Sequence, residues 1–395
     1  MKRKEQTDNV ARLLIISAID ISLLRFRGRL IEALIARGYK VFLAAPLFAD
    51  STRASLEALG AKLVEYPVNR TGLNPLRDTK TRHALSSIIR DNKIDLVFPY
   101  TVKPVIYGSW TAHKNGIAVV SLITGLGYGF SAASIKARML ELVLTKLYRS
   151  ALRYNSAVIF QNVDDRQLFI DRRLLRKDMP TTVVDGSGVD LQEFSWREPR
   201  QATALRFVFA GRLIKEKGVG LFIDAAETLK NRWPEAEFYV LGDPQPGSPS
   251  SIDLQRLNSL AESGVVVHHR RRADIADFLS RCDVFVLPTY YREGVPRSIL
   301  EALSTGMVVI TTDTPGCRET VKNGENGYLV KPKDLVSLTT AMQSVLENPE
   351  QVTDMSRASR RLAEQRFDVE IVNEAIIEII DSNLPARTRQ LSGLA

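Results

Sequence analysis

Cysteine is scarce in this chain, with Cys282 and Cys317 as the only two among 395 residues. Two cysteines are too few for a disulfide framework or a zinc site, and their scarcity fits a cytosolic location. Redox chemistry is therefore not expected. Histidine is also rare, at four residues. Metal binding by His268 and His269 is not expected, because adjacent residues of a strand point to opposite faces.

Long apolar runs are also missing. No stretch approaches 18 uninterrupted apolar residues, so we expect no transmembrane helix. The first twenty residues, MKRKEQTDNVARLLIISAID, are basic, but their apolar part is short and ends at Asp20. This pattern argues against a signal peptide. We therefore expect a cytoplasmic protein.

Motifs of nucleic-acid recognition are absent as well. The chain has neither zinc-finger spacing nor an RNA-binding aromatic motif, although its net charge is +9. Basic residues are interspersed with acidic ones along most of its length. A sugar nucleotide, a lipid pyrophosphate or a membrane surface would satisfy the same positive charge. We expect no nucleic-acid partner.

What the chain does have is an alternation of short apolar runs and amphipathic helical stretches, in two series. Such runs are typical of buried parallel strands. The first series is 12–17, 40–46, 62–68, 95–100, 117–123 and 157–162. The second series is 206–211, 237–242, 265–269, 283–288, 307–312 and 327–330. We predict an α/β protein with two doubly wound, Rossmann-like domains and ligands at the strand ends and in the cleft between domains.

The length also favours two domains. The polar stretch 190–204 separates the two series, so we place an N-terminal domain at 1–190 and a C-terminal domain at 200–366. A last helix at 367–383 is strongly apolar on one face. We expect it to pack back towards the N-terminal domain.

The stretch REGVPRSILEALSTG, residues 292–306, sets Glu293 and Glu301 eight positions apart around Pro296. Proline suits the first turn of a helix and Gly306 suits its C-cap. Glu293 then lies in the loop before the helix and Glu301 about one and a half turns along it. The free N–H groups of Arg297, Ser298 and Ile299 would form an anion site. An alternative is that both glutamates are simply solvated.

The stretch FVFAGRLIKEKGV, residues 207–219, ends a strand with Gly211 and then supplies Arg212 and Lys217. Glycine lets the backbone approach a ligand, and the two cations can bond phosphate oxygens. Surface lysines near a turn are common, however. The position at a strand C-terminus favours the phosphate interpretation.

Three glycines at 125, 127 and 129 follow another strand in ITGLGYGF. Their spacing is G-x-G-x-G, and no strand ending in an acidic residue follows about 20 residues later, so dinucleotide binding is not expected.

Two basic stretches leave alternatives open. Residues 133–154 could lie on an anionic membrane or could simply cover the sheet. HHRRR, residues 268–272, could contact an anion through an arginine or could be a solvated charge cluster.

Taken together, these stretches resemble the retaining glycosyltransferases of family 4, which have the GT-B fold and use nucleotide sugars. The resemblance covers nearly the whole chain. It rests on GSGVDLQEF (186–194), FAGRLIKEKGV (209–219), LGD (241–243), the segment 273–330 and the closing helix. The segment 273–330 contains the family's E-x7-E element in order.

The resemblance implies roles for these residues. Glu293 would approach the donor sugar, Glu301 would bind the ribose, and Arg212 and Lys217 would hold the donor pyrophosphate. Glu293, Arg212 and Lys217 are thus the implied catalytic residues. The implied donor site is Gly211, Arg212, Lys217, Arg271, Glu293, Gly294, Val295, Pro296, Ser298 and Glu301. Such enzymes need no metal and no other cofactor, and a UDP-sugar is the expected donor.

YTVKPVIYGSWTAHKNG (100–116) with ITGLGYGF resembles the branch that extends undecaprenyl-diphosphate-linked saccharides in bacterial surface-polysaccharide or glycan assembly. The expected enzyme adds a hexose or N-acetylhexosamine at the inner face of the cytoplasmic membrane, to which it binds peripherally. The acceptor-side candidates are Arg25, Phe26, Arg27, Lys103, Gly125, Gly127 and Tyr128. The chain departs from many members in carrying Thr124 where they have a histidine, and in lacking a glycine-rich first loop.

Two other functions remain open at this point. One is a sugar-nucleotide epimerase or hydrolase, which would need well-placed acid and base groups. The other is a non-catalytic protein that binds sugar nucleotides as a scaffold. Presence of all four residues Arg212, Lys217, Glu293 and Glu301 argues against the scaffold.

Overall fold

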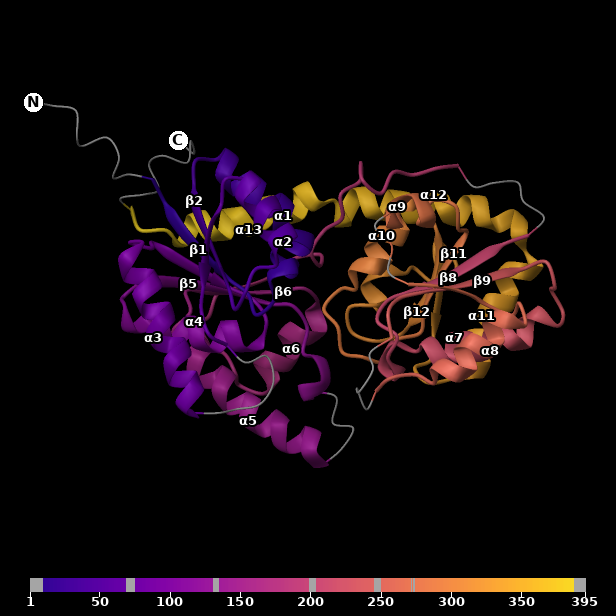
Figure 1. Cartoon of the computed structure of the whole chain (residues 1–395), viewed down its shortest axis with the longest axis horizontal. Helices are drawn as coiled ribbons and strands as arrows, with labels where there is room; N and C mark the ends of the chain where they lie inside the picture. Colours follow the sequence, from indigo (N-terminus) through magenta and orange to yellow (C-terminus); the bar gives the residue numbers. More distant parts are fainter. Residues whose placement is uncertain are drawn as a thin grey trace, which may run out of the picture. The chain divides into compact units, whose positions relative to one another are not determined.

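The computed structural model describes residues 10–68, 75–130, 135–198, 204–244, 250–270, 272 and 274–386. They divide into two compact units (Figure 1). Unit 1 is the chain up to Ser187 together with the chain from Glu370 on, and unit 2 is Gly188–Val369. Each unit contains one parallel β-sheet with helices on both faces. The α/β class with two doubly wound domains is therefore confirmed.

The described part of unit 1 has seven strands in the order β3-β2-β1-β4-β5-β6-β7. They are β1 (Arg12–Ile16), β2 (Lys40–Ala45), β3 (Lys62–Glu65), β4 (Leu96–Pro99), β5 (Ala118–Ile123), β6 (Ala157–Phe160) and β7 (Thr181–Val183). Six of them coincide with predicted apolar runs. The sequence does not predict β7, because it has only three residues, two of which are threonines. It pairs in parallel with β6 at the sheet edge.

Helices cover both faces of this sheet. They are α1 (Asp20–Ala36), α2 (Asp50–Ala58), α3 (Pro75–Asp91), α4 (Val102–Lys114), α5 (Ile135–Leu152), α6 (Val163–Asp171) and α13 (Val369–Asn383). Helices α1, α2 and α13 pack on one face, and α3, α4 and α5 pack on the other (Figure 1). Parallel strands covered in this way are apolar on both faces, which explains their continuous Val/Ile/Leu runs.

Helix α13 comes after unit 2 in the sequence, yet from Glu370 on it belongs to unit 1. Its buried face, Ile376, Ile377 and Ile380, joins the apolar core of α1 and the sheet. At its C-terminal end the Tyr39 hydroxyl donates a hydrogen bond to the Asp381 carboxylate. Burial and this carboxylate both raise the pKa of Tyr39 far above its ordinary value, so the phenol stays protonated. The apolar face and this hydrogen bond together attach α13 to unit 1.

Unit 2 repeats the design with the strand order β10-β9-β8-β11-β12-β13 in its described residues. The strands are β8 (Arg206–Ala210), β9 (Glu237–Leu241), β10 (Val267–His269), β11 (Val284–Leu287), β12 (Val308–Thr312) and β13 (Gly327–Val330). Each coincides with a predicted run of the second series. The helices are α7 (Val219–Lys230), α8 (Leu254–Glu262), α9 (Ile275–Leu279), α10 (Arg297–Thr305), α11 (Leu335–Glu347) and α12 (Val352–Leu362). Figure 1 shows α9, α10 and α12 on one face and α7, α8 and α11 on the other.

Residues 188–198 belong to unit 2, whereas the sequence places a polar seam at 190–204. Val189 exchanges backbone hydrogen bonds with the 367–369 segment. Phe194 is buried in the core of unit 2, and its carbonyl accepts a 2.6 Å hydrogen bond from Ser304 Oγ. The stretch 190–204 is polar overall, yet it contributes the aromatic side chain of Phe194 to the core of unit 2. The boundary between the units therefore lies before it, at Ser187/Gly188.

Candidate active site

Lys217 and Glu293 meet at the carboxyl ends of the strands of unit 2. Lys217 follows β8 and Glu293 follows β11, and Lys217 Nζ lies 2.5 Å from Glu293 Oε1. The two side chains are only 10% and 16% exposed. Strands β8 and β11 are neighbours at which the strand order reverses direction. Such a switch point is where doubly wound sheets bind their ligands.

Thr289 links the two loops that carry this pair. Its buried Oγ1 lies 3.0 Å from the Glu216 carbonyl and 3.3 Å from Glu293 Oε1. The backbone N–H groups of Tyr290 and Tyr291 donate to the same Glu216 carbonyl at 2.9 and 3.1 Å. The loop after β8 and the loop after β11 are therefore held to each other by hydrogen bonds. Glu293 has a fixed position within unit 2 as a result.

Two glycines make this arrangement possible. Gly316 has φ +79°, and a Cβ at this position would lie 1.3 Å from the carbonyl oxygen of Gly294. Gly218 has φ +77°, and its Cβ would lie 2.1 Å from the Pro288 carbonyl oxygen. Both positions adopt the left-handed conformation that favours glycine. At both, a Cβ atom would clash with a backbone carbonyl group, which cannot move aside as a flexible side chain could. Gly316 thus supports the loop of Glu293, and Gly218 follows Lys217 directly.

Helix α10 begins next to Pro296, as the sequence predicts. Pro296 is its N-cap, and Gly306 in the left-handed conformation is its C-cap as predicted. The sequence predicts a free N–H group at Ile299. This group instead donates a hydrogen bond to the Pro296 carbonyl at 3.0 Å, so it is not available to a ligand. The predicted anion site is therefore reduced to the N–H groups of Arg297 and Ser298. No side chain caps this helix N-terminus in the described residues.

Glu301 lies on α10 and forms an ion pair with Arg297, whose Nε is 2.9 Å from Glu301 Oε1. Both side chains are mostly buried, at 20% and 18% exposed. The sequence predicts a role for the backbone of Arg297 but not for its side chain. The spacing of four residues along a helix is the signal that could have indicated this pair.

Arg212 is exposed after the end of β8, and its guanidinium lies 5.4 Å from the ring centroid of Tyr291. Tyr291 is on the loop that carries Glu293. Gly211 precedes Arg212, and its N–H donates to the Leu241 carbonyl at 3.0 Å. Gly294, Val295 and Pro296 are buried between Glu293 and α10. Unit 2 therefore brings together the donor-side residues predicted on the loops after β8 and β11, with two cations among them.

Acceptor-side candidates occupy unit 1. Lys103 lies in the first turn of α4, after β4, and burial lowers its pKa. Gly125 and Gly127 follow β5 and have φ of +108° and +58°. Strands β1, β4 and β5 are consecutive in the sheet. The side chain of Tyr128 is outside the described residues.

The three adjacent acceptor-side candidates on α1 do not all lie on the surface of unit 1. Arg25 and Phe26 are exposed, whereas Arg27 is 2% exposed and its guanidinium lies 5.4 Å from the Tyr100 ring centroid. A helix turns by about 100° per residue, so three consecutive residues cannot share one face. Arg27 thus lies in the interior of unit 1, away from the surface of the other two.

Two family models match this chain. Residues 191–362 match the glycosyl transferases group 1 model, and residues 13–162 match the glycosyl transferase 4-like model. The chain is a glycosyltransferase. The first match contains Lys217 and Glu293, and the second contains Lys103 and Gly125.

Curated relatives support this assignment. The glycosyltransferase is 27% identical to N,N'-diacetylbacillosaminyl-diphospho-undecaprenol alpha-1,3-N-acetylgalactosaminyltransferase of Campylobacter jejuni, over 94% of this chain and 98% of the relative. It is also 27% identical to UDP-Gal:alpha-D-GlcNAc-diphosphoundecaprenol alpha-1,3-galactosyltransferase of Escherichia coli, over 69% of this chain and 72% of the relative.

Solved structures establish the GT-B fold of this glycosyltransferase. Anabaena Alr3699/HepE in complex with UDP and glucose superposes with a TM-score of 0.76 at 20% identity, covering 94% of this chain and all of that one. Sucrose-phosphate synthase of Thermosynechococcus elongatus superposes with a TM-score of 0.77 at 17% identity, over 94% and 98% of the two chains. The GT-B fold expected from the sequence resemblance is confirmed.

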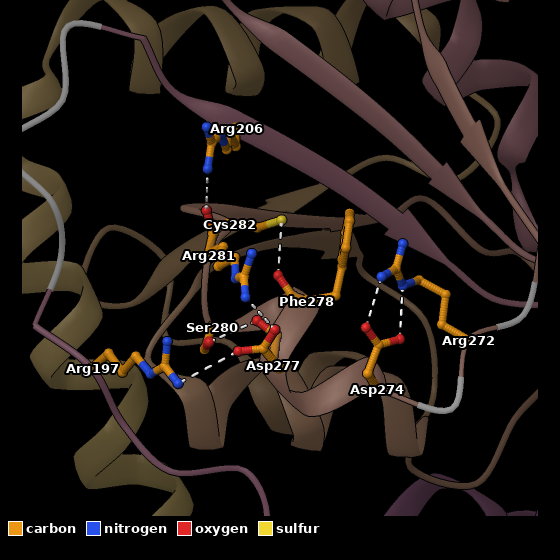
Figure 2. Close-up of polar contacts among 9 residues, drawn as sticks. All are labelled: Arg197, Arg206, Arg272, Asp274, Asp277, Phe278, Ser280, Arg281 and Cys282. Atoms are coloured by element: carbon orange, nitrogen blue, oxygen red, sulfur yellow. Dashed lines mark hydrogen bonds and ion pairs between the residues drawn. The ribbon is translucent and has the colours of Figure 1, made fainter.

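Arg272, in the basic stretch 268–272 of the glycosyltransferase, is paired with a carboxylate. Arg272 forms two hydrogen bonds to Asp274, at 2.9 and 2.7 Å (Figure 2). Asp277 lies within 2.6 Å of Arg281 and 3.6 Å of Arg197. Arg271, a predicted donor contact, lies outside the described residues. Figure 2 therefore favours the charge-cluster interpretation for Arg272.

Cys317 lies in the core of unit 2 near Glu293. Burial raises the pKa of its thiol to about 11, and the negative charge of Glu293 adds to the rise. The thiol is thus neutral at pH 7 and a poor nucleophile.

Proposed function

We propose that this glycosyltransferase moves a hexose or N-acetylhexosamine from a UDP-sugar to an undecaprenyl-diphosphate-linked saccharide, with retention at the anomeric carbon, in the synthesis of a bacterial surface glycan. The observation that carries the proposal is the buried Lys217–Glu293 pair at the switch point of unit 2. Two relatives support the substrate class, because both are named for transfer to diphospho-undecaprenol saccharides in alpha linkage.

The charges of the site suit a diphosphate leaving group. Arg212 and Lys217 would hold the diphosphate, and the N–H groups of Arg297 and Ser298 would add the positive end of α10. As the bond between the anomeric carbon and the phosphate oxygen breaks, negative charge grows on the diphosphate. Fixed cations and helix dipoles stabilise such developing charge without reorganisation.

Glu293 would stabilise the opposite charge, on the sugar. The carboxylate is held beside Lys217 and would lie near the anomeric carbon as that carbon becomes oxocarbenium-like. The acceptor hydroxyl would attack from the face that the diphosphate leaves, and its proton would pass to the leaving phosphate oxygen. Glu301, oriented by Arg297, would bind the ribose hydroxyls of the nucleotide. Positioning and electrostatics thus supply the catalysis.

Release of UDP tests this proposal against the two alternatives. The intact protein is incubated with a panel of UDP-sugars, with and without an undecaprenyl-diphosphate-linked saccharide. We expect one donor to give release that depends on the acceptor, and Glu293→Gln to lose it. A rearranged sugar nucleotide would indicate an epimerase, and release without acceptor a hydrolase. Binding of UDP-sugars without release, for every acceptor tried, would favour the scaffold.

The proposed chemistry uses no metal ion. A divalent metal that neutralises a leaving diphosphate supplies several kcal/mol, so its removal costs an enzyme far more than tenfold in rate. We therefore expect excess EDTA to change the rate of sugar transfer by less than about twofold. Restoration of activity by added Mg²⁺ or Mn²⁺ after an EDTA-induced loss would contradict this expectation.

Helix α5 provides a surface for peripheral attachment to a membrane. Met139 and Leu142 are each 65% exposed, and Val143 is 40% exposed. Arg138 and Lys146 are exposed on the same helix, while Leu144 and Tyr148 on its opposite side are buried. No helix among the described residues is long and apolar enough to span a bilayer. Exposed apolar side chains flanked by cations are typical of helices that lie on anionic membranes.

The whole helix layer around α5 is basic. Helices α3, α4 and α5 together contain ten lysines and arginines against three aspartates and glutamates. This charge attracts anionic lipids within about a Debye length, which is roughly 10 Å at 0.1 M salt. Complete recovery of the protein from membranes in buffer without salt would contradict the attachment.

Replacement of Met139 and Leu142 tests the contribution of the exposed apolar side chains of α5 to membrane binding. We expect Met139→Ser/Leu142→Ser to weaken binding to phosphatidylglycerol vesicles at least about tenfold, because even partial burial of two such side chains contributes roughly 2 kcal/mol. Vesicle sedimentation at fixed low salt measures this change. Val336→Ser is the matched control, because Val336 is 75% exposed on α11 of unit 2. Equal binding by both variants would overturn the assignment of α5.

A further inference from the structure

A small cavity lies between helices α3 and α4 of unit 1, outside the residues that either substrate site uses. Its volume is about 140 Å³. This is roughly ten times the probe volume that one water molecule needs, so a tetrahedral anion fits with water to spare. The lining residues are Thr79, Arg82, His83, Ser86, Thr111 and Lys114. None of them is acidic.

The cavity has a basic rim, with Arg82 and Lys114 as its cations, and a hydroxyl floor. Arg82, His83 and Lys114 are exposed at its rim, and Ser86 and Thr111 are buried beneath them, at 7% and 2% exposed. Ser86 Oγ is hydrogen-bonded to the amide of Asn115, at 3.0–3.2 Å. Thr111 Oγ1 is buried without a hydrogen-bond partner in the part of the chain that the structure describes. A buried hydroxyl of this kind is normally satisfied.

The basic side chains of the rim form no ion pairs in the described part of the chain. Arg82, His83 and Lys114 form no ion pair within 4.0 Å with any carboxylate of the described residues. This distinguishes them from Arg272 and Arg281, which are paired with aspartates. Two cations, Arg82 and Lys114, with the imidazole of His83 and the unpartnered Thr111 hydroxyl around one concave space, form a chemical environment that suits a phosphate group.

Two contacts hold the rim in place. The Arg82 guanidinium lies 5.4 Å from the ring centroid of Trp110, and Trp110 Nε1 donates a 3.1 Å hydrogen bond to Ser150 on α5. His83 Nδ1 lies 2.9 Å from the Thr79 carbonyl oxygen. Arg82 is therefore connected through Trp110 to α5, the helix with the exposed apolar patch.

We propose that this cavity is an anion site that binds a phosphate group, separate from the donor site of unit 2. The ligand is either the phosphate of an anionic lipid headgroup or free phosphate, which present the same chemistry to the rim. The lipid source rests on the proposed membrane attachment through α5, whereas the anion site itself does not.

The site is tested by the stabilisation that phosphate confers on the intact protein. A ligand that binds only the folded state raises the melting temperature as its concentration increases. Phosphate is titrated at constant ionic strength with UDP present in saturating amount, so that the donor site is occupied. We compare wild type with Arg82→Gln/Lys114→Gln and with the control Lys80→Gln/Arg90→Gln, which removes two exposed cations of α3 outside the cavity.

We expect wild type and the control to respond alike, and the cavity variant to need at least ten times more phosphate for half of the rise. A response of the cavity variant equal to that of the control would overturn the site. Arg212→Ala should retain the phosphate response, which separates this site from the donor site. The assay involves no sugar transfer, so its outcome does not depend on the proposed enzymatic function.

Vesicles then distinguish the two sources. If the cavity variant binds phosphatidylglycerol vesicles more weakly than the control, with no difference on phosphatidylcholine vesicles, the ligand is a lipid headgroup. If vesicle binding is equal while the phosphate response is lost, the ligand is a free phosphate. If neither response differs from the control, the proposal is wrong.

Discussion

Lys217→Ala should lower kcat for sugar transfer by about 10²–10³, the usual effect of removing one preorganised group that stabilises developing charge. Lys217 is the buried cation of the pair with Glu293, and the proposed mechanism places it against the leaving diphosphate. Lys215→Ala is the matched control. Lys215 lies two residues earlier in the same 3-10 turn and is exposed. Steady-state kinetics of both variants measure the effect, and a loss of similar size in each would contradict it.

A structural role of Lys217 must be separated from the catalytic one. Truncation leaves the Glu293 carboxylate mostly buried without its partner, which destabilises the fold. The double variant Lys217→Met/Glu293→Gln removes both charges together. We expect its melting temperature to lie closer to that of wild type than that of Lys217→Ala, while its activity stays lost. Recovery of activity in the double variant would show that the pair only stabilises unit 2.

Gly316→Ala should lower both stability and activity. The new Cβ would meet the Gly294 carbonyl oxygen at 1.3 Å, so the loop of Glu293 must move. A displacement of about 1 Å at a reacting group can reduce the rate by about 10². Melting temperature and kcat are both measured.

Gly324→Ala provides the control for this substitution. Gly324 has φ +81°, close to the +79° of Gly316, but its Cβ would meet nothing within 4 Å. The control therefore includes only the cost of a left-handed alanine, about 1–2 kcal/mol. We expect Gly324→Ala to keep near wild-type kcat. Equal kcat in the two variants would contradict the supporting role of Gly316.

The sequence predicts most of the fold because buried parallel strands have a simple signature. Among the described residues, continuous apolar runs indicate every strand of unit 2 and all but β7 of unit 1. Pro296 and Gly306 mark the two ends of α10 to within one residue. These features depend on local chemistry, in which side-chain size and backbone freedom decide the conformation.

Other features depend on which distant segments meet. Lys217 and Glu293 are 76 residues apart, and only the adjacency of β8 and β11 brings them together. Gly316 in a Thr-Pro-Gly turn does not indicate which backbone it will touch. The same holds for the buried Arg27 and for the cavity between α3 and α4. The family resemblance implies the roles of the site residues. Which of these residues contact one another is visible only in the three-dimensional structure.

The mass of the lipid-linked product tests the central claim most directly. An undecaprenyl-diphosphate-linked saccharide is incubated with the intact protein and the UDP-sugar that supports UDP release. We predict that the lipid gains one hexose or N-acetylhexosamine, in alpha linkage by NMR, and that Glu293→Gln yields no such product. A lipid of unchanged mass despite UDP release would contradict the claim, and a beta linkage would contradict retention.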